Sequence, residues 1–479
     1  MYFQTLSHAG LRVVAGGKEL LCDPWVVGST YWRSWWNYPP VPAELVASLK
    51  PDFIYLTHLH WDHFQSASLR RFDRDTQILV PYDRYERIVR DLRHVGMTNI
   101  RELRHGERIE LAPNFALTSY HFAPFITDSA PMIEADGVTI FNANDAKLAG
   151  APLKHILKRH PRIDFCLRSH SSANPRACFH TVDSAEQTEV EDDNDRYIRA
   201  FSLFMAAVKP RFAIPFASNN CLLHDDVYEM NHLVQTPQMV AESFARFAEE
   251  QRLDTRVQIM APGDRWDSAS GFHIQHNDWF EDRPAKLAAY REQVMPTLER
   301  QRAKEARTSV SLKTVQRFFT RLAANVPSVL TRKLKGAEVL IVARSGEKSA
   351  GFAVDLHGGG SVREIAPGQF GAFDKRIDFP AIVLRQALAM NMFQHAGISK
   401  RVHYYATTAA MPALKRFVAI LELAEAEVFP LRSNLNLRAI RALLPRWREG
   451  LLYARALADV ARGNKLPDLE LRYLSELSA

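Results

Sequence analysis

Hydrophobic residues in the first 270 positions recur as short runs that end in polar stretches. Such runs occupy 53–56, 115–120, 138–142 and 212–215. Apolar runs of this length, bounded by polar residues, predict buried β-strands. Amphipathic stretches at 84–95 and 238–250 predict helices, and Gly96 is a typical helix C-cap. We therefore expect short strands interleaved with helices in this part of the chain.

The pattern changes after residue 270. Residues 283–335 are predicted to be helical and rich in Lys and Arg, and we interpret their basic face as solvated surface or as a surface for an anionic lipid head or polymer. Residues 337–379 alternate with period two between glycine-rich turns, which predicts four strands, the last at 369–373. Helices are predicted at 379–395, 412–425 and 437–462. We expect three segments: a first domain at 1–270, a basic helical linker at 271–336, and an α+β accessory domain with C-terminal helices at 337–479.

Three histidines and a carboxylate follow the run at 53–56 within six residues: His58, His60, Asp62 and His63. If the strand geometry persists, His58 and His60 point to the same side. Neutral imidazoles and a carboxylate suit a borderline divalent metal such as zinc, iron or manganese. Desolvating four such groups together would be costly without a cation. A polar loop that merely holds histidines is the alternative, and the H-x-H-x-D-H order argues against it.

The stretch His58-Leu59-His60-Trp61-Asp62-His63 resembles the signature of the metallo-β-lactamase fold. The resemblance covers roughly residues 1–270 and implies an α/β fold, an αββα sandwich. Members are mostly metal-dependent hydrolases, with a minority of di-iron oxidoreductases and oxygenases. The opening Leu6-Ser7-His8-Ala9-Gly10 and the later Asp23-Pro24-Trp25 resemble one branch. That branch includes ascorbate-phosphate lactonases, N-acyl-phosphatidylethanolamine phospholipases D and CMP-N-acetylneuraminic acid hydroxylases.

The resemblance implies further metal ligands: one more histidine, a bridging carboxylate and a final histidine. His121 and Asp145 fit the first two roles in type, order and position at strand ends. No histidine stands directly after the strand at 212–215, where the last one belongs. His170 and His224 remain as alternative replacements. This departure, together with the segment around His224, resembles the CMP-N-acetylneuraminic acid hydroxylases.

Four cysteines, far apart and without a C-x-x-C pair, limit the redox chemistry. In the hydroxylases a Rieske cluster feeds electrons to the oxygenation site, and no such cluster is encoded here. Few cysteines also make a reduced cytoplasm the expected location. The sequence shows neither a signal-peptide pattern nor a transmembrane run.

Charge and aromatic content indicate the kind of ligand. The net charge is +7, which favours anionic partners such as phosphorylated or carboxylated substrates, or contact with an anionic membrane surface. The basic residues carry no nucleic-acid motif, so no nucleic acid is expected. Trp35 and Trp36 belong to an aromatic-rich stretch that we interpret as a wall beside the site. Arg168 is a candidate to pair with the anion.

Three functional hypotheses follow. The first is a hydrolase with two divalent metal ions, for which zinc is favoured and iron is the alternative. In it, Asp62 orients a metal-bound hydroxide that attacks an anionic small molecule or lipid. The alternative is a di-iron oxygenase of the hydroxylase type that uses an external electron donor. The third is a non-enzymatic scaffold that keeps a structural metal and binds an anionic or lipid partner through 283–479.

Overall fold

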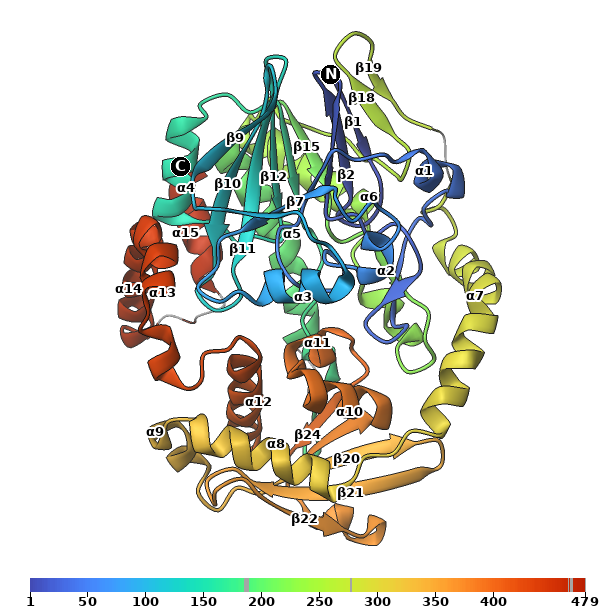
Figure 1. The fold of residues 1–479 in the computed structure, drawn as a ribbon, viewed down its shortest axis with the longest axis vertical. Helices are drawn as coiled ribbons and strands as arrows, with labels where there is room; N and C mark the ends of the chain where they lie inside the picture. Colours follow the sequence, from blue (N-terminus) through green and yellow to red (C-terminus); the bar gives the residue numbers. More distant parts are fainter. Residues whose placement is uncertain (185–188, 276–277, 464, 466–467, 479) are drawn as a thin grey trace.

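The protein forms two facing β-sheets in the upper part of Figure 1 and a separate third sheet in the lower part. A small three-stranded sheet also forms, in the order β16-β5-β4, from β4 (Ser29–Thr30), β5 (Trp35–Asn37) and β16 (Asn220–Leu222). The structure is a computed structural model. It describes the chain except residues 185–188, 276–277, 464, 466–467 and 479, and except the side chains of 189–194. Part of the polar stretch before the helix at 189 therefore lies outside the described residues.

The first sheet has eight strands in the order β19-β18-β1-β2-β3-β6-β7-β8. Its N-terminal strands pair antiparallel and β3, β6, β7 and β8 pair parallel. The strands are β1 (Tyr2–Thr5), β2 (Leu11–Ala15), β3 (Lys18–Cys22), β6 (Phe53–Tyr55), β7 (Gln77–Pro81), β8 (Ile100–Leu103), β18 (Arg265–Asp267) and β19 (Gly271–His273). The strand predicted at 53–56 is confirmed.

The second sheet has seven strands in the order β17-β15-β13-β12-β11-β10-β9. β9 to β12 pair antiparallel, and β12, β13, β15 and β17 pair parallel. The strands are β9 (Glu107–Ala112), β10 (Phe115–Phe122), β11 (Asp128–Ala135), β12 (Val138–Asn144), β13 (Phe165–Arg168), β15 (Phe212–Pro215) and β17 (Arg256–Val257). The strands predicted at 115–120, 138–142 and 212–215 are confirmed.

Helices cover the outer faces of both sheets. Between the sheets, Phe3, Leu20, Leu117 and Phe165 form part of one buried core. A second core joins the outer face of the first sheet to α1 and α3, and a third joins the second sheet to α4, α5 and α6. These helices are α1 (Ala43–Ser48), α2 (Ser66–Leu69), α3 (Arg87–Val95), α4 (Gly150–Arg159), α5 (Glu189–Val208) and α6 (Pro237–Gln251). The layer order is αββα, which confirms the predicted fold class.

The third sheet has six strands in the order β14-β24-β23-β20-β21-β22. Its strands are β14 (Phe179–Thr181), β20 (Val339–Ser345), β21 (Lys348–Asp355), β22 (Ser361–Ile365), β23 (Lys375–Pro380) and β24 (His403–Ala406). The long helix α7 (Arg283–Ala306) runs down from the sandwich to this sheet (Figure 1), and α8 (Leu312–Asn325) and α9 (Ser328–Thr331) follow. β14 comes from the first 270 residues but pairs with β24, so the chain reaches the third sheet once at β14 and a second time through α7.

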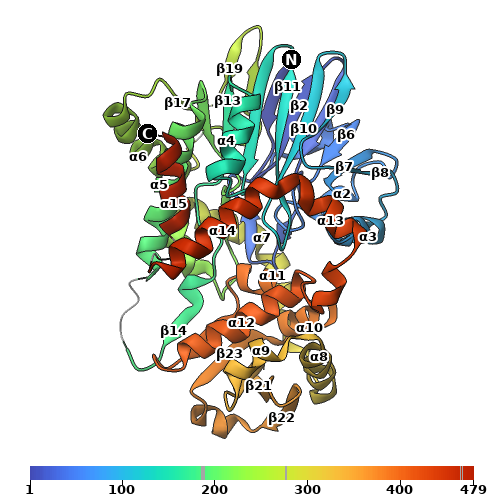
Figure 2. The same cartoon turned by 90° about the vertical axis from the view of Figure 1, so that its left-hand side faces the viewer.

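The C-terminal helices return to the sandwich. α12 (Met411–Glu425) packs with the third sheet, whereas α14 (Trp447–Ala461) contacts α4 and α15 (Leu469–Ser478) contacts α4 and α5. Figure 2 shows α14 crossing in front of the sandwich, with α13 (Leu437–Leu443) at its end beside α3. The division at 270 and 336 stays a prediction.

Three predicted elements of the last segment differ from the structure. The helix predicted at 379–395 is two helices, α10 (Ala381–Met390) and α11 (Phe393–Ile398), separated by Asn391 in a left-handed conformation. The helix at 437–462 is interrupted by a 3₁₀ turn (Leu444–Arg446) that contains Pro445, because proline cannot continue the backbone hydrogen bonding. The strand predicted at 369–373 is wrong: that segment lies in a 3₁₀ turn (Pro367–Ala372).

Every helix among the described residues is too short or too polar to span a bilayer.

Candidate metal centre

The candidate site lies where strands of the two facing sheets end. β3 ends at Cys22 and Asp23 follows; β6 ends at Tyr55 and the His58–His63 loop follows; β12 ends at Asn144 and Asp145 follows. The carboxyl ends of parallel strands meet at one edge of a sheet, where loops present functional side chains. The sequence therefore places several polar side chains at the same edge.

One group of converging side chains is His8, Asp62 and His63, whose ligand atoms lie within 4.8 Å of one another. All three side chains are buried. His8 Nε2 lies 3.1 Å from Asp62 Oδ2 but has no hydrogen-bond partner among the described residues. An imidazole nitrogen and a carboxylate oxygen that approach without hydrogen-bond geometry are well placed to share a cation.

A second group is His58, His63 and Asp145, again within 4.8 Å. His63 Nε2 lies 3.1 Å from Asp145 Oδ2, and the rings of His58 and His63 are 4.1 Å apart. His60 adjoins this group, because its Nδ1 lies 2.9 Å from His58 Nε2. The two groups share His63, so together they can hold two neighbouring cations. The structure thus brings together four residues of the motif and Asp145.

Asp128, at the start of β11, also faces this group and was not predicted. Its Oδ1 lies 3.4 Å from His58 Nδ1 and has no hydrogen-bond partner among the described residues. Burial and the charge of Asp145 raise the pKa of Asp128 well above its ordinary value. No sequence pattern marks Asp128. His8, also missed, stood inside the Leu6–Gly10 stretch that resembles the lactonase and hydroxylase branch, so a signal for it existed.

The structure does not bring His121 to either group. Its side chain is buried on β10, where Nε2 lies 2.9 Å from Ser119 Oγ. In the β10–β11 register His121 opposes Ser129 and Phe122 opposes Asp128. Side chains alternate between the two faces of a strand, so Phe122 and Asp128 reach the cavity while His121 turns the other way. Asp128 on β11 therefore faces the candidate ligands, whereas the predicted ligand His121 does not.

The two alternatives for the final histidine lie in different places. His170 is fully buried, and neither of its ring nitrogens has a hydrogen-bond partner among the described residues. Burial, followed by the nearby His8, lowers the pKa of His170 to about 3. His224 instead lies in a cluster with Glu305 and Arg401, outside the cavity. Of the two, only His170 adjoins the first group, and its role as a ligand stays a prediction.

Buried partners orient the candidate ligands. Asp23 Oδ2 lies 2.8 Å from His63 Nδ1, and its Oδ1 accepts a 2.8 Å hydrogen bond from the backbone N–H of Thr57. A carboxylate on one ring nitrogen fixes the tautomer that leaves the other nitrogen free for a metal. The Tyr31 hydroxyl donates a 2.5 Å hydrogen bond to Asp62 Oδ1. These contacts hold His63 and Asp62 in fixed orientations.

The protonation states also fit cation binding. Burial and the neighbouring His63 and His60 hold the pKa of His58 well below its ordinary value, so its ring is neutral and can donate a lone pair. Asp62, Asp128 and Asp145 place three carboxylates around these histidines, and divalent cations would balance their negative charge. The chemistry of the donor set therefore fits a pair of divalent cations.

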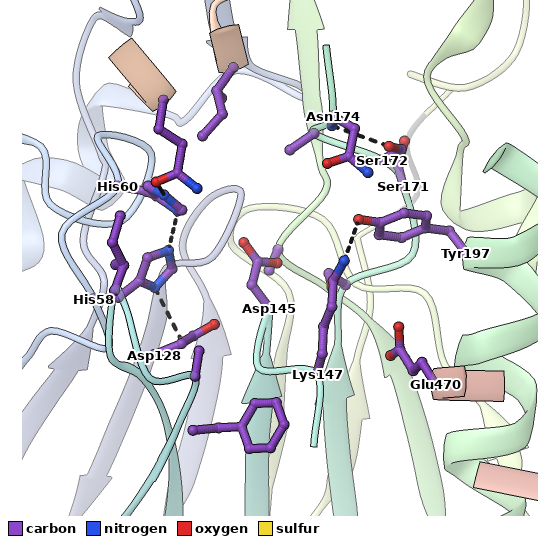
Figure 3. A pocket seen from close by; sticks show the side chains of 18 of the residues that line it. His58, His60, Asp128, Asp145, Lys147, Ser171, Ser172, Asn174, Tyr197 and Glu470 are labelled. Carbon is purple, nitrogen blue, oxygen red and sulfur yellow. Dashed lines mark hydrogen bonds and ion pairs between the residues drawn. The ribbon is translucent and has the colours of Figure 1, made fainter. Parts of the chain in front are cut away.

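A cavity of about 860 Å³ opens beside this site. In Figure 3, His58, His60 and Asp128 form one wall, with Asp145 pointing into the space between the walls. Lys147, Ser171, Ser172, Asn174, Tyr197 and Glu470 lie on the opposite side. Lys147 Nζ donates a 3.1 Å hydrogen bond to the Tyr197 hydroxyl. The cavity is large enough for a small-molecule substrate.

The three predicted substrate-binding residues occupy different settings. Trp35 lines the cavity. Trp36, its neighbour on the short strand β5 (Trp35–Asn37), faces away, and its Nε1 donates to the carbonyl of Arg33. Arg168 lines the cavity, but its Nη2 forms a 2.8 Å ion pair with Glu470. Its charge is therefore already partly compensated.

The third sheet and the helices that pack with it, including α11 and α12, form what we call the third-sheet unit. This unit contributes residues to the metal side of the cavity, which the sequence did not indicate. Gln394 Oε1, on α11, lies 3.3 Å from His60 Nε2. The adjacent His395 Nε2 lies 3.3 Å from the Leu59 carbonyl and its Nδ1 contacts Glu425 of α12. Residues from three distant parts of the chain therefore enclose one site.

Comparisons with known proteins agree with the predicted branch. No protein-family model matches the chain. It is 26% identical over 242 residues to a protein named as a candidate Rieske 2Fe-2S iron–sulfur protein from Mycolicibacterium smegmatis, covering 48% of this chain and 46% of the relative. A similarly named protein from Mycobacterium tuberculosis is 25% identical over 327 residues, covering 63% and 62%. The cytidine monophosphate-N-acetylneuraminic acid hydroxylase of Mus musculus is 29% identical over 147 residues, covering 29% and 25%.

The Mus musculus relative confirms the resemblance to the hydroxylases. The chain spans only about a quarter to three fifths of the lengths of these three relatives. Among solved structures, an isothiocyanate hydrolase from Delia radicum gut bacteria aligns with a TM-score of 0.39 at 17% identity, covering 56% of this chain and 99% of that one. CmlA, a diiron β-hydroxylase from Streptomyces venezuelae, aligns with a TM-score of 0.35 at 15% identity, covering 54% and 52%. Likenesses this distant do not bear on function.

Proposed function

We propose that this chain is a di-iron oxygenase that hydroxylates an anionic small molecule or lipid. His8, Asp62, His63, His58, His60, Asp128 and Asp145 would hold the iron pair, and electrons would come from a separate iron–sulfur donor protein. The proposal reverses the order of preference that the sequence suggested, in which a zinc hydrolase came first. The expected cytoplasmic location stays a prediction.

The observation that carries the proposal is Asp128 facing His58. With Asp62 and Asp145 it makes the site rich in carboxylate oxygens. Imidazoles with one carboxylate suit zinc and iron alike, and each added carboxylate oxygen shifts the preference toward a harder cation such as non-haem iron. The similarity to a hydroxylase over 147 residues supports the same class of reaction.

The iron pair, when bound, supplies the activation of O₂. In the overall reaction one oxygen atom enters a C–H bond of the substrate and the other leaves as water. The balance needs two electrons and two protons, and the donor protein supplies the electrons one at a time. No such donor is encoded among the four separated cysteines of this chain.

The remaining steps belong to the side chains of the cavity. Trp35 and Phe122 offer apolar walls for the carbon that reacts, and Lys147 and Arg176 on the cavity wall can orient an anionic group by charge. The Tyr31 hydroxyl holds Asp62 by a 2.5 Å hydrogen bond, which keeps this carboxylate from rotating. Residues of α11 and of the C-terminal helices cover part of the cavity.

Metal identity tests the proposal. The protein is purified without added metal, and iron and zinc are measured together with the visible spectrum. We expect about two iron ions per chain and visible absorption. After chemical reduction without oxygen, the protein should consume O₂ when O₂ is admitted. In the Asp128→Ala variant the iron content should fall to about one per chain. Asp164→Asn, at a buried aspartate away from the cavity, is the matched control and should keep both ions. Stoichiometric zinc without visible absorption would exclude the oxygenase.

A metal-dependent hydrolase is the second candidate, and the position of Asp62 favours it. This carboxylate lies at the metal end of the cavity, between Tyr31 and His8, where it can orient a water molecule toward a substrate. Hydrolysis adds that water across a bond and needs no electrons. Activity that persists with zinc in strictly anaerobic buffer would select this candidate.

A further inference from the structure

Large hydrophobic side chains are exposed along one C-terminal segment, residues 431–460. Leu444 is 70% exposed, and Trp447 is 53% exposed. In the rest of the described chain, exposed side chains of this kind are single and scattered, for example Phe125 and Val329. The segment exposes Leu431, Leu435, Leu437, Ile440, Leu443, Leu444, Trp447, Leu451, Leu457 and Val460. Large exposed apolar side chains concentrated in one segment are typical of an interaction surface. We call it the α13–α14 face.

The charges of the α13–α14 face have one sign. Arg432 and Arg441 are exposed between the hydrophobic side chains, whereas the exposed Arg455 is already paired with Glu476 of α15. The acidic residues of the segment, Glu449 and Asp459, are only 4% and 2% exposed, and Glu449 is paired with the buried Arg446. The surface therefore combines exposed Leu, Ile and Trp with arginine and presents no exposed carboxylate between 431 and 460. That composition is typical of helices that lie in the interface of an anionic membrane.

The opposite side of α14 faces the protein. Leu452, Tyr453 and Ala456 line the cavity, and Leu452 packs in the core that joins α4, α5 and α15. α14 therefore carries large hydrophobic side chains on both sides, although only one side is covered. The helix also contains charged residues, so it is amphipathic rather than a core helix. The hydrophobic side chains on its outer side have no apolar cover among the described residues.

We infer that the α13–α14 face docks on the surface of an anionic phospholipid bilayer. α13 and α14 lie across the outside of the molecule in Figure 2 and meet at the 3₁₀ turn that carries Leu444. Leu444 and Trp447 enter the acyl boundary, and Arg432 and Arg441 contact the phosphates. In the docked state α14 separates the bilayer from the cavity. The docking does not depend on which reaction the metal site performs.

A second copy of the chain is a weaker candidate for this surface. A two-fold contact would place the arginines of one α13–α14 face against those of the other, and no exposed carboxylate of the segment would compensate them. Phospholipid head groups supply the opposite charge instead. The membrane therefore satisfies both the apolar and the basic character of the surface.

Vesicle flotation of the full-length protein tests the inference. The vesicles contain either phosphatidylcholine alone or phosphatidylcholine with about one third phosphatidylglycerol. We expect flotation with the anionic vesicles and little with the neutral ones. The double variant Leu444→Ser/Trp447→Ser should lower the vesicle affinity about tenfold or more, because two buried apolar side chains are lost. Arg441→Gln should weaken binding to anionic vesicles only.

Val329→Ser is the matched control, since Val329 is 62% exposed on α9, away from the α13–α14 face. Its vesicle affinity should equal that of the wild type. The inference is overturned if the wild type stays unbound at low salt, or if Val329→Ser weakens binding as much as the double variant. It is also overturned if the wild type does not bind vesicles and elutes as a dimer in size-exclusion chromatography, whereas the double variant elutes as a monomer.

Discussion

His63 is the side chain shared by both groups of candidate ligands. Its Nε2 faces Asp145 and its Nδ1 faces Asp23. Burial alone would lower the pKa of His63, but Asp23 and Asp62 outweigh it and raise the pKa well above the ordinary value. A ring held by Asp23 on Nδ1 is fixed in orientation, which leaves Nε2 as the one nitrogen that can bind a cation.

Asp23→Asn should weaken metal binding without removing a ligand. The amide cannot accept the Nδ1–H of His63 as strongly as a carboxylate, so the metal affinity should fall about 10- to 100-fold. Competition with a chelator measures this affinity. Asp164→Asn serves as control, because Asp164 also caps a backbone N–H, that of Thr139. Equal affinities for Asp23→Asn and the wild type would show that Asp23 is only a turn residue.

Glu422 is a carboxyl group on the cavity wall that favours its neutral form. Burial and the nearby Glu425 raise the pKa of Glu422 to about 7. The folded state therefore holds this proton to a higher pH than the unfolded state, and the associated stability is lost as the pH rises from about 4.5 through about 7. Glu422→Gln should be more stable than the wild type by about 2–3 kcal/mol at about pH 8 and by much less at about pH 5. Urea unfolding at the two pH values measures the difference, and an equal effect at both would contradict the assignment.

The element that joins the third-sheet unit to the site is the short helix α11. Glu425 on α12 accepts a 2.5 Å hydrogen bond from the backbone N–H of Gln394 and contacts the His395 ring. The start of α11 is fixed in this way, so that Gln394 faces His60 Nε2. If that nitrogen carries the proton, the lone pair on His60 Nδ1 points toward His58 Nε2 at 2.9 Å, where a cation can bind both.

Gln394→Ala should therefore lower metal affinity about tenfold or less, a smaller loss than removal of a ligand. Gln386→Ala is the control on the adjacent α10, where Gln386 accepts a hydrogen bond from Trp32 Nε1. Chelator competition and thermal unfolding, measured together, separate the two roles. A purely structural Gln394 would change the unfolding temperature and leave the metal affinity of the folded protein unaltered.

The C-terminal helix α15 packs against the first part of the chain and completes one wall of the cavity. Leu474 of α15 is fully buried in the core that contains Phe201 and Phe204 of α5, and Glu470 of the same helix pairs with Arg168 at the cavity. The last residues of the chain thus complete a wall formed by residues near 168. Loss of the α15 packing should therefore both destabilise the fold and open the cavity wall.

Leu474→Ala should cost about 2–5 kcal/mol of unfolding free energy, because a buried leucine is truncated in a packed core. Leu457→Ala on α14 is the matched control: Leu457 is 73% exposed, so its truncation should change stability by about 0.5 kcal/mol or less. Urea denaturation measures both. Equal, small effects would mean that α15 does not unfold cooperatively with the sandwich.

Local sequence determined the strands of the first domain and the motif loop. The run at 53–56 ends where β6 ends, and His58, His60, Asp62 and His63 converge because they lie within one short loop. Asp145 joined them because it follows β12, whose end was visible as a change from apolar to polar residues. Hydrophobic periodicity and short-range spacing carry this information by themselves.

Tertiary structure decided the rest of the site. Asp128 rather than His121 faces His58 because of the β10–β11 register, and a shift of one residue reverses which side chain points inward. His8, Gln394 and Glu470 reach the cavity from positions that are adjacent to the motif only after folding. Contacts between residues hundreds of positions apart depend on how the layers pack, and the alternation of polar and apolar residues along the chain does not encode that packing.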